Sequence, residues 1–191
     1  MKRLALVTGI LALTAPLALA QTSTWTSDPA HSEVDFSITH LTVANVHGHF
    51  GKVAATIQFN EADIAQSSVT ATIDVSAVDT GDSPRDSVLK SSDFFDVENF
   101  PSASFTSTRV VKNGNRLTIT GNLTVRGVTR PVVLDAEGPT RPVPGMDHKP
   151  HAGFSATTTI SRTAFGIGSM FPAAIAGDDA KLTIELEVVK Q

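Results

Sequence analysis

Alternation of apolar and polar side chains with a period of two residues runs through most of this chain, and it constrains the fold more than any other feature. Val69, Ala71 and Ile73, for example, are each followed by a Thr or an Asp. Successive side chains of a β-strand point to opposite faces, so each such segment has one apolar and one polar face. That pattern is typical of antiparallel sheets, because buried parallel strands are apolar on both faces. Eight segments follow it: 33–39, 53–59, 69–75, 103–111, 117–125, 131–136, 154–160 and 182–188.

One stretch, residues 83–100, lacks this alternation. Ser83 can cap a helix there, and Pro84 suits its first helical position. Residues 92–96 resemble a second capped turn, and Pro101 would end it. We therefore expect one or two short helices between the third and fourth strands.

Eight antiparallel strands of one-sided polarity can close into a barrel or form a two-sheet sandwich, and periodicity alone does not separate these folds. An eight-stranded barrel either fills its interior with side chains or holds one small ligand. The sequence has no internal repeat and no linker that would divide it. The strands are therefore expected to form one domain.

The first twenty residues have the features of a secretory signal peptide. Lys2 and Arg3 precede an apolar run, Pro16 interrupts this run, and residues 18–20 read Ala-Leu-Ala, a typical cleavage site. The alternative is a transmembrane anchor, but the uncharged run 4–20 is short for a span and contains a proline. We predict residues 1–20 as signal peptide, cleavage after Ala20, a mature domain of residues 21–191, a periplasmic or secreted location and no stable membrane insertion.

Composition excludes several classes of function. The 191 residues contain no Cys, which rules out disulfides, thiol catalysis, Cys-ligated zinc and iron–sulfur clusters. The formal net charge is −4, and no basic run is longer than two residues. Nucleic-acid binding needs clustered Lys and Arg, so we expect no nucleic-acid partner.

Candidate catalytic and metal-binding groups are weak. His47 and His49 would lie on the same face of a strand, a spacing that can chelate a metal ion, but no third ligand is nearby in the sequence. Two surface histidines are the favoured interpretation. A Gly-x-Ser-x-Gly nucleophile motif and a phosphate-binding glycine loop are also missing from the sequence. We therefore predict no catalytic residue, no metal site, no cofactor and no enzymatic activity.

Several motifs, in their order and spacing, resemble the YceI family of lipocalin-like, polyisoprenoid-binding proteins. The insert at residues 85–96, which reads RDSVLKSSDFFD, is the most specific of them. The others lie at residues 28–34, 46–50, 121–131 and 165–168, so the resemblance covers about residues 25–190. It implies an all-β fold: an eight-stranded antiparallel lipocalin-like barrel with a short helical insert between strands three and four.

The same resemblance implies a periplasmic or secreted binding protein whose barrel takes a long isoprenoid chain. One departure is Val88, where many relatives carry His, so a contact to a ligand headgroup could be altered.

We accordingly predict a binding or carrier protein for an isoprenoid lipid or a quinone. Strand alternation and the insert select its site residues. The predicted ligand-binding residues are Phe36, Ile38, Val53, Ile73, Phe105, Leu117, Ile119 and Phe154 in the walls, Phe94, Phe95 and Phe171 at the mouth, and Arg85 at the polar end of the ligand.

Two other functions stay open at this stage. One is a solidly packed stress-response or interaction protein without a ligand; the other is a lipid-acting hydrolase or isomerase, which needs a Ser or carboxylate beside a His inside the cavity. The sequence also leaves the oligomeric state open, a homodimer included.

Overall fold

The computed structural model describes residues 22–191, and the predicted signal peptide lies outside them. Eight long antiparallel strands pair in a closed ring, in the order β1-β3-β4-β6-β7-β8-β10-β11, and β11 pairs with β1 again. A sandwich would have left two open sheets, so the ring identifies a barrel. This confirms the predicted fold class. The strands are β1 Ser23–His40, β3 Val53–Phe59, β4 Ser68–Asp74, β6 Ser102–Asn113, β7 Arg116–Val125, β8 Val128–Glu137, β10 Pro150–Ser161 and β11 Ala176–Lys190.

Three further strands lie outside the eight predicted segments. β2 (Ala44–Phe50) includes the strand expected at His47 and His49 but is too polar to show alternation, and β5 (Val78–Asp79) and β9 (Val143–Pro144) have two residues each. β2 folds back on the second half of β1 as a hairpin, through a turn in which Leu41 and Thr42 have positive φ angles. Tertiary pairing, rather than local pattern, therefore decides these strands.

The insert forms one helix, α1 (Ser83–Lys90). Its N-cap is Asp82 rather than the predicted Ser83: the Asp82 carboxylate accepts a hydrogen bond from the backbone N–H of Arg85 at 2.9 Å. Residues 91–99 form successive turns, so the second helix that we considered is not formed. Short 3-10 helices span Ile64–Gln66, Val75–Ala77 and Thr163–Phe165.

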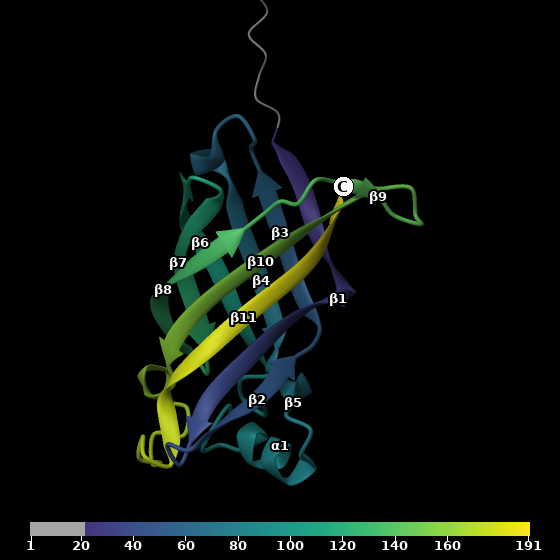
Figure 1. Cartoon of the computed structure of the whole chain (residues 1–191). Coiled ribbons are helices and arrows are strands. Elements are labelled where there is room, and N and C mark those ends of the chain that lie inside the picture. The colour runs from purple at the N-terminus through teal and green to yellow at the C-terminus, as the bar shows by residue number, and fades with distance from the viewer. Residues whose placement is uncertain (1–21) are drawn as a thin grey trace, which may run out of the picture.

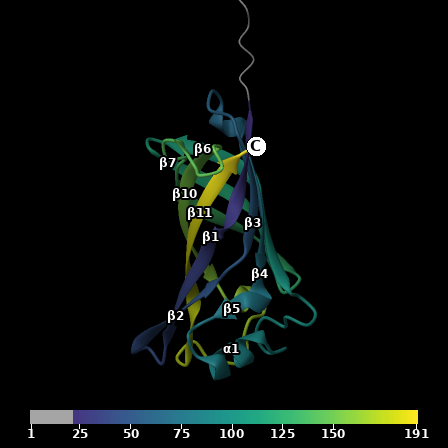
Figure 2. The ribbon, with the colours of Figure 1, turned by 90° about the vertical axis from the view of Figure 1, so that its right-hand side faces the viewer.

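The barrel has two different ends (Figure 1). At the helix end, α1 and the turns after it lie beside β2, β5 and the β10–β11 connection, and Figure 2 shows α1 across the opening. At the termini end, the backbone N–H of Gln191 bonds to the carbonyl of Thr24 at 2.9 Å, which joins the C-terminus to the start of β1. No helix among residues 22–191 combines the length and apolar character that a membrane span requires.

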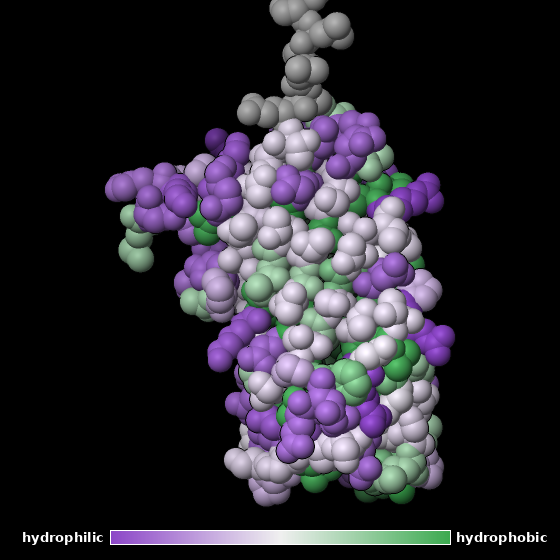
Figure 3. All heavy atoms as spheres, turned by 180° about the vertical axis from the view of Figure 1, so that it is seen from behind, coloured by the Kyte–Doolittle hydropathy of each residue, from purple (hydrophilic) through white to green (hydrophobic). Residues whose placement is uncertain are grey.

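The outside of the barrel is mostly polar or intermediate in hydropathy. Figure 3 shows this from behind, with scattered hydrophobic side chains that include some at the lower edge. Alternation has thus sorted the side chains as predicted: apolar faces turn inward and Thr or charged faces turn outward.

Phenylalanine rings pack against glycines throughout the structure. A glycine leaves room for a ring on the neighbouring strand or loop, since a Cβ at each of these glycines would approach the ring to within 2.8 Å or less. The pairs are Phe36 with Gly48, Phe94 with Gly168, Phe100 with Gly127, Phe105 with Gly121, and Phe154 with Gly138.

Replacing Gly121 with alanine tests this packing. The new Cβ would lie 2.3 Å from Cζ of Phe105 and 2.6 Å from the carbonyl oxygen of Thr106, and the backbone atom cannot move aside easily. Overpacking of this kind costs about 1–3 kcal/mol of unfolding free energy, which urea denaturation would measure. Gly51→Ala is the matched control, because no atom lies within 4 Å of its Cβ position. Equal stability of the two variants would contradict the packing described.

Candidate functional site

Two apolar cavities lie end to end inside the barrel. The helix-end cavity has a volume of about 250 Å³ and lies against α1 and the turn that follows it. The termini-end cavity has a volume of about 130 Å³ and lies between the strands that surround Ile57 and Phe154. Both are lined by Val34, Ile73, Leu123 and Leu182, so these four side chains form the boundary at which the cavities meet.

Eleven of the twelve predicted site residues line these cavities, and Ile73 lines both. The termini-end cavity is lined by Val53, Ile73, Phe105, Leu117, Ile119 and Phe154. The helix-end cavity is lined by Phe36, Ile38, Ile73, Arg85, Phe94 and Phe95.

Phe171 is the exception, because it lines neither cavity. Its ring packs against Phe94 with a centroid distance of 5.2 Å, and its carbonyl accepts from Arg162, so it contacts the cavity through these two lining residues.

Aromatic rings form much of the helix-end cavity. Phe50 lies between Phe36 and Phe95, with centroid distances of 5.4 Å to each, and its contact with Phe95 is edge to face. Such tilted and edge-to-face pairs are favoured arrangements of aromatic rings. Strands β1 and β2 thereby hold the turn after α1 against the cavity.

Arg85 is held in place at this end by Thr80. Its Nε donates to the Thr80 hydroxyl at 2.8 Å and its Nη2 to the Thr80 carbonyl at 2.9 Å. The Thr80 hydroxyl in turn donates to Asp86 at 2.5 Å. Within residues 22–191, Nη1 of Arg85 makes no hydrogen bond, and no carboxylate lies within ion-pair distance of the guanidinium. Arg85 itself lines the helix-end cavity through its apolar stem, because the walls of this cavity expose apolar atoms only.

Val88, on the next turn of α1, also lines the helix-end cavity and is 51% exposed. It thus lies where this cavity reaches the surface, and it offers a polar ligand group no hydrogen bond.

Arg162, which the sequence analysis did not single out, lies beside the same cavity and is 3% exposed. Its guanidinium donates five hydrogen bonds to backbone carbonyls, three in the β10–β11 connection and two at the start of β11, and no carboxylate lies within 4.0 Å of it in the described chain. No local pattern marks it, because a lone Arg after an alternating strand predicts an exposed side chain.

Catalytic chemistry has little support inside the barrel. His40 is the single histidine among the cavity-lining residues, and neither lining includes a carboxylate. The serines that line a cavity, Ser67, Ser68 and Ser155, belong to the termini-end cavity, whereas His40 belongs to the helix-end cavity. The linings of these two cavities thus do not bring a Ser, a His and a carboxylate together.

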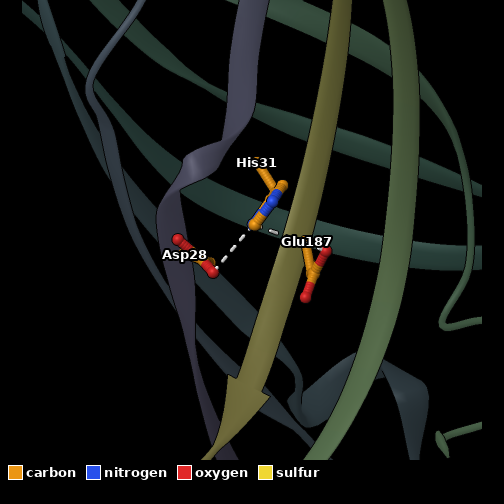
Figure 4. A group of neighbouring side chains, drawn as sticks. All are labelled: Asp28, His31 and Glu187. Atoms are coloured by element: carbon orange, nitrogen blue, oxygen red, sulfur yellow. Dashed lines mark hydrogen bonds and ion pairs between the residues drawn. The ribbon is translucent and has the colours of Figure 1, made fainter. Parts of the chain in front are cut away.

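A separate group of titratable side chains lies on the barrel wall, where β1 bulges. Asp28, His31 and Glu187 converge there (Figure 4), and His151 and Asp147 extend the group. The hydrogen bond with Asp28 raises the pKa of His31, and the same contact is the main reason that the pKa of Asp28 is lowered. Hydrogen bonds to Asp147 and then to Glu187 raise the pKa of His151. The pKa of Asp147 is lowered, mainly by the hydrogen bond from the backbone N–H of Lys149 and secondly by the hydrogen bond with His151.

Comparison with known proteins agrees with this architecture. The family model for the YceI-like domain matches residues 25–188. A UPF0312 protein of Pectobacterium atrosepticum is 37% identical over 179 residues, which cover 91% of this chain and 89% of that protein. A protein of Salmonella newport named YceI is 38% identical over 166 residues, which cover 84% and 83% of the two chains.

Solved structures show the same barrel. BcnA of Burkholderia cenocepacia superposes with a TM-score of 0.74 at 27% identity, over 84% of this chain and 98% of that one. A polyisoprenoid binding domain from Saccharophagus degradans has a TM-score of 0.63 at 13% identity, over 90% of this chain and 100% of that one, and shares the fold. With its family model, its relatives and its barrel in agreement, the chain belongs to the YceI family.

Proposed function

We propose that this protein binds one long apolar isoprenoid lipid or quinone inside its barrel and carries or stores it outside the cytoplasm. The observation that carries this proposal is the pair of adjoining apolar cavities. Each buried CH₂ group contributes roughly 0.8 kcal/mol, so a polyprenyl chain taken from water into these cavities gains more than a few polar contacts could supply. The YceI-like domain and the polyisoprenoid-binding neighbour support the same ligand class.

The ligand would lie with its polar end at Arg85 and its tail toward the termini end. Arg85 Nη1 is a free donor, and the termini-end cavity has no charged side chain in its lining. A carbonyl or hydroxyl group at the helix end would be satisfied once the Arg85 guanidinium turns toward the cavity, whose walls expose only apolar atoms, while the tail would contact mainly strand side chains. Phe94, Phe95 and Phe171, the three residues predicted at the mouth, would cover the isoprenoid chain of the ligand where it enters the barrel.

An apolar rim at the helix end fits the loading of such a ligand. Leu41 and Val43, in the β1–β2 turn, are 51% and 80% exposed, and Met170 and Ile175 of the β10–β11 connection are 68% and 42% exposed. The backbone N–H of Leu41 bonds to the carbonyl of Ile175 at 2.9 Å, which brings the two segments together. An exposed apolar patch of this kind suits contact with lipid or with another protein.

The cavities also separate this proposal from a packed interaction protein. A barrel that carried no ligand would be expected to fill its interior to the density of an ordinary core. The absence of a catalytic constellation from the described cavity walls disfavours the lipid-acting enzyme.

Solvent extraction of protein purified from the extracytoplasmic fraction of expressing cells tests the proposal. We expect mass spectrometry to find a co-purified isoprenoid lipid or quinone, and the stripped protein to bind an added polyprenol or ubiquinone at about one molecule per chain. Intact mass starting at Gln21 would establish cleavage after Ala20. A protein that yields no lipid and binds neither probe would refute the proposal.

A further inference from the structure

The bulge in β1 creates a convergent set of metal-ligand atoms on the outside of the barrel. The register of β1 against β11 shifts between Ser27 and Ser32, so residues 28–31 leave the ladder. Oδ1 of Asp28 accepts from the backbone N–H of Ala30 at 2.8 Å, which leaves Oδ2 to face Nδ1 of His31 at 3.0 Å. Oε2 of Glu187 approaches the same nitrogen at 3.9 Å. One ligand atom from each of the three side chains lies within 4.8 Å of the others (Figure 4).

We infer that Asp28, His31 and Glu187 bind a divalent transition-metal ion, with Zn²⁺ as the representative. One imidazole and two carboxylates are donors that such ions accept, and three protein ligands leave a position for water or another ligand. Two carboxylates also neutralise the charge of a divalent cation.

The distances suit a small rearrangement. Bonds of 2.0–2.2 Å around one tetrahedral ion place the ligand atoms about 3.3–3.6 Å apart. The His31–Asp28 contact is 3.0 Å and the His31–Glu187 contact is 3.9 Å, so the latter must shorten by a few tenths of an ångström. The carboxylate oxygens of Asp28 and Glu187 start within 4.8 Å of one another and close on the ion from there. The His31 and Glu187 side chains are 64% and 38% exposed, so both have room to move.

Two further residues orient Glu187 as the outer groups of metal sites do. Nδ1 of His151 lies 2.6 Å from Oε1 of Glu187, which leaves Oε2 for the ion. Nε2 of His151 lies 3.0 Å from Asp147. These two contacts link Glu187 of β11, through His151, to Asp147 in the segment before β10. They limit the rotation of the Glu187 carboxylate.

Access is open, because His31, His151 and Glu187 line a surface hollow of about 420 Å³. An ion can therefore arrive from solvent and keep a water ligand. The inference is independent of the lipid proposal, since none of the three ligands lines either barrel cavity.

The rival is the exposed pair His47 and His49 on β2, whose spacing can also chelate a metal ion. No third His or carboxylate in residues 22–191 joins that pair in a group of three converging ligands, whereas Glu187 and Asp28 join His31. These two histidines provide the matched control.

The test is calorimetric titration of the EDTA-stripped protein with Zn²⁺ alone, in a mildly alkaline non-coordinating buffer. We expect one Zn²⁺ per chain, and at least about tenfold weaker binding by His31→Gln and by Glu187→Gln, which are close in size to the native side chains. The His47→Gln/His49→Gln double variant should bind as the wild type does. Circular dichroism would establish that each variant is folded.

Three results would overturn the inference: a wild type that binds no Zn²⁺, unchanged affinity in folded His31→Gln and Glu187→Gln, or loss of binding in the double variant alone. Absorption spectra with Co²⁺ supply a second readout, because nitrogen and oxygen ligation at this site should produce visible bands that His31→Gln removes and the double variant keeps.

Discussion

Replacing Arg162 with methionine is expected to lower the free energy of unfolding by about 3–5 kcal/mol. Methionine keeps an unbranched apolar stem and removes the guanidinium. The acceptors that lose their donor are the carbonyls of Ile167, Gly168, Phe171, Ala176 and Gly177, at 2.5–2.9 Å.

The size of this effect follows from burial. Arg162 is 3% exposed, and Ile167, one of the residues whose carbonyl it binds, is 7% exposed. A buried acceptor that loses its partner costs about 1–3 kcal/mol, and water can reach some of the five carbonyls but not all. The segment 167–177 has no regular secondary structure before Ala176, so few other backbone hydrogen bonds would replace these.

Arg130→Met is the matched control. Arg130 is exposed, and its Nε donates one long bond, of 3.3 Å, to the carbonyl of Ala164. Its replacement should change stability by less than about 0.5 kcal/mol in the same urea titration. If both variants lose equally little, the guanidinium does not hold the β10–β11 connection.

The second large effect concerns ligand length and rests on the proposed function. Leu182→Trp places a large ring at the boundary of the two cavities, where Leu182 now lines both. We expect affinity for a long polyprenol to fall about 100-fold, which corresponds to about 2.7 kcal/mol. Loss of about four buried CH₂ groups, at roughly 0.8 kcal/mol each, is enough to produce it. A short prenol that fits the helix-end cavity should bind within about threefold of the wild type, since its CH₂ groups remain buried.

Fluorescence competition with prenols of graded length would measure this change. Val143→Trp is the control, because Val143 lies on β9 and is 58% exposed, away from the barrel interior. Equal loss for long and short prenols would mean that the tail does not cross the Leu182 boundary. Binding of neither by the wild type would instead refute the proposed function itself.

Alternation predicted the eight barrel strands because burial of one strand face requires an apolar residue at every second position. It also predicted which strand side chains turn inward, and all eight wall residues that it selected line a cavity, as do the three selected from the insert. Phe171 was selected as an apolar loop residue. A loop has no regular alternation, so the sequence does not predict whether its side chain points into the barrel. Its contact with Phe94 depends on the path of the β10–β11 connection.

Other features depend on residues that meet only in the folded chain. β2 pairs with β1 although its sequence is polar and contains Gly48, because Phe36 of β1 occupies the space that the glycine leaves. Glu187 meets His31 only because β11 closes the ring on β1, which no local pattern reports. Arg162 is buried among five backbone carbonyls, three of the β10–β11 connection and two at the start of β11, all of which accept from its guanidinium.

By itself, then, the sequence determined the class of fold, the direction of the strand side chains and, through its motifs, the family. Tertiary structure decided that the sheet closes as a barrel, that two cavities remain inside it, and that charged residues distant in the chain converge on its wall. The reason is physical: hydrophobic burial imposes a short period on the chain, whereas ring closure, cavity volume and ligand convergence depend on contacts between residues far apart in sequence.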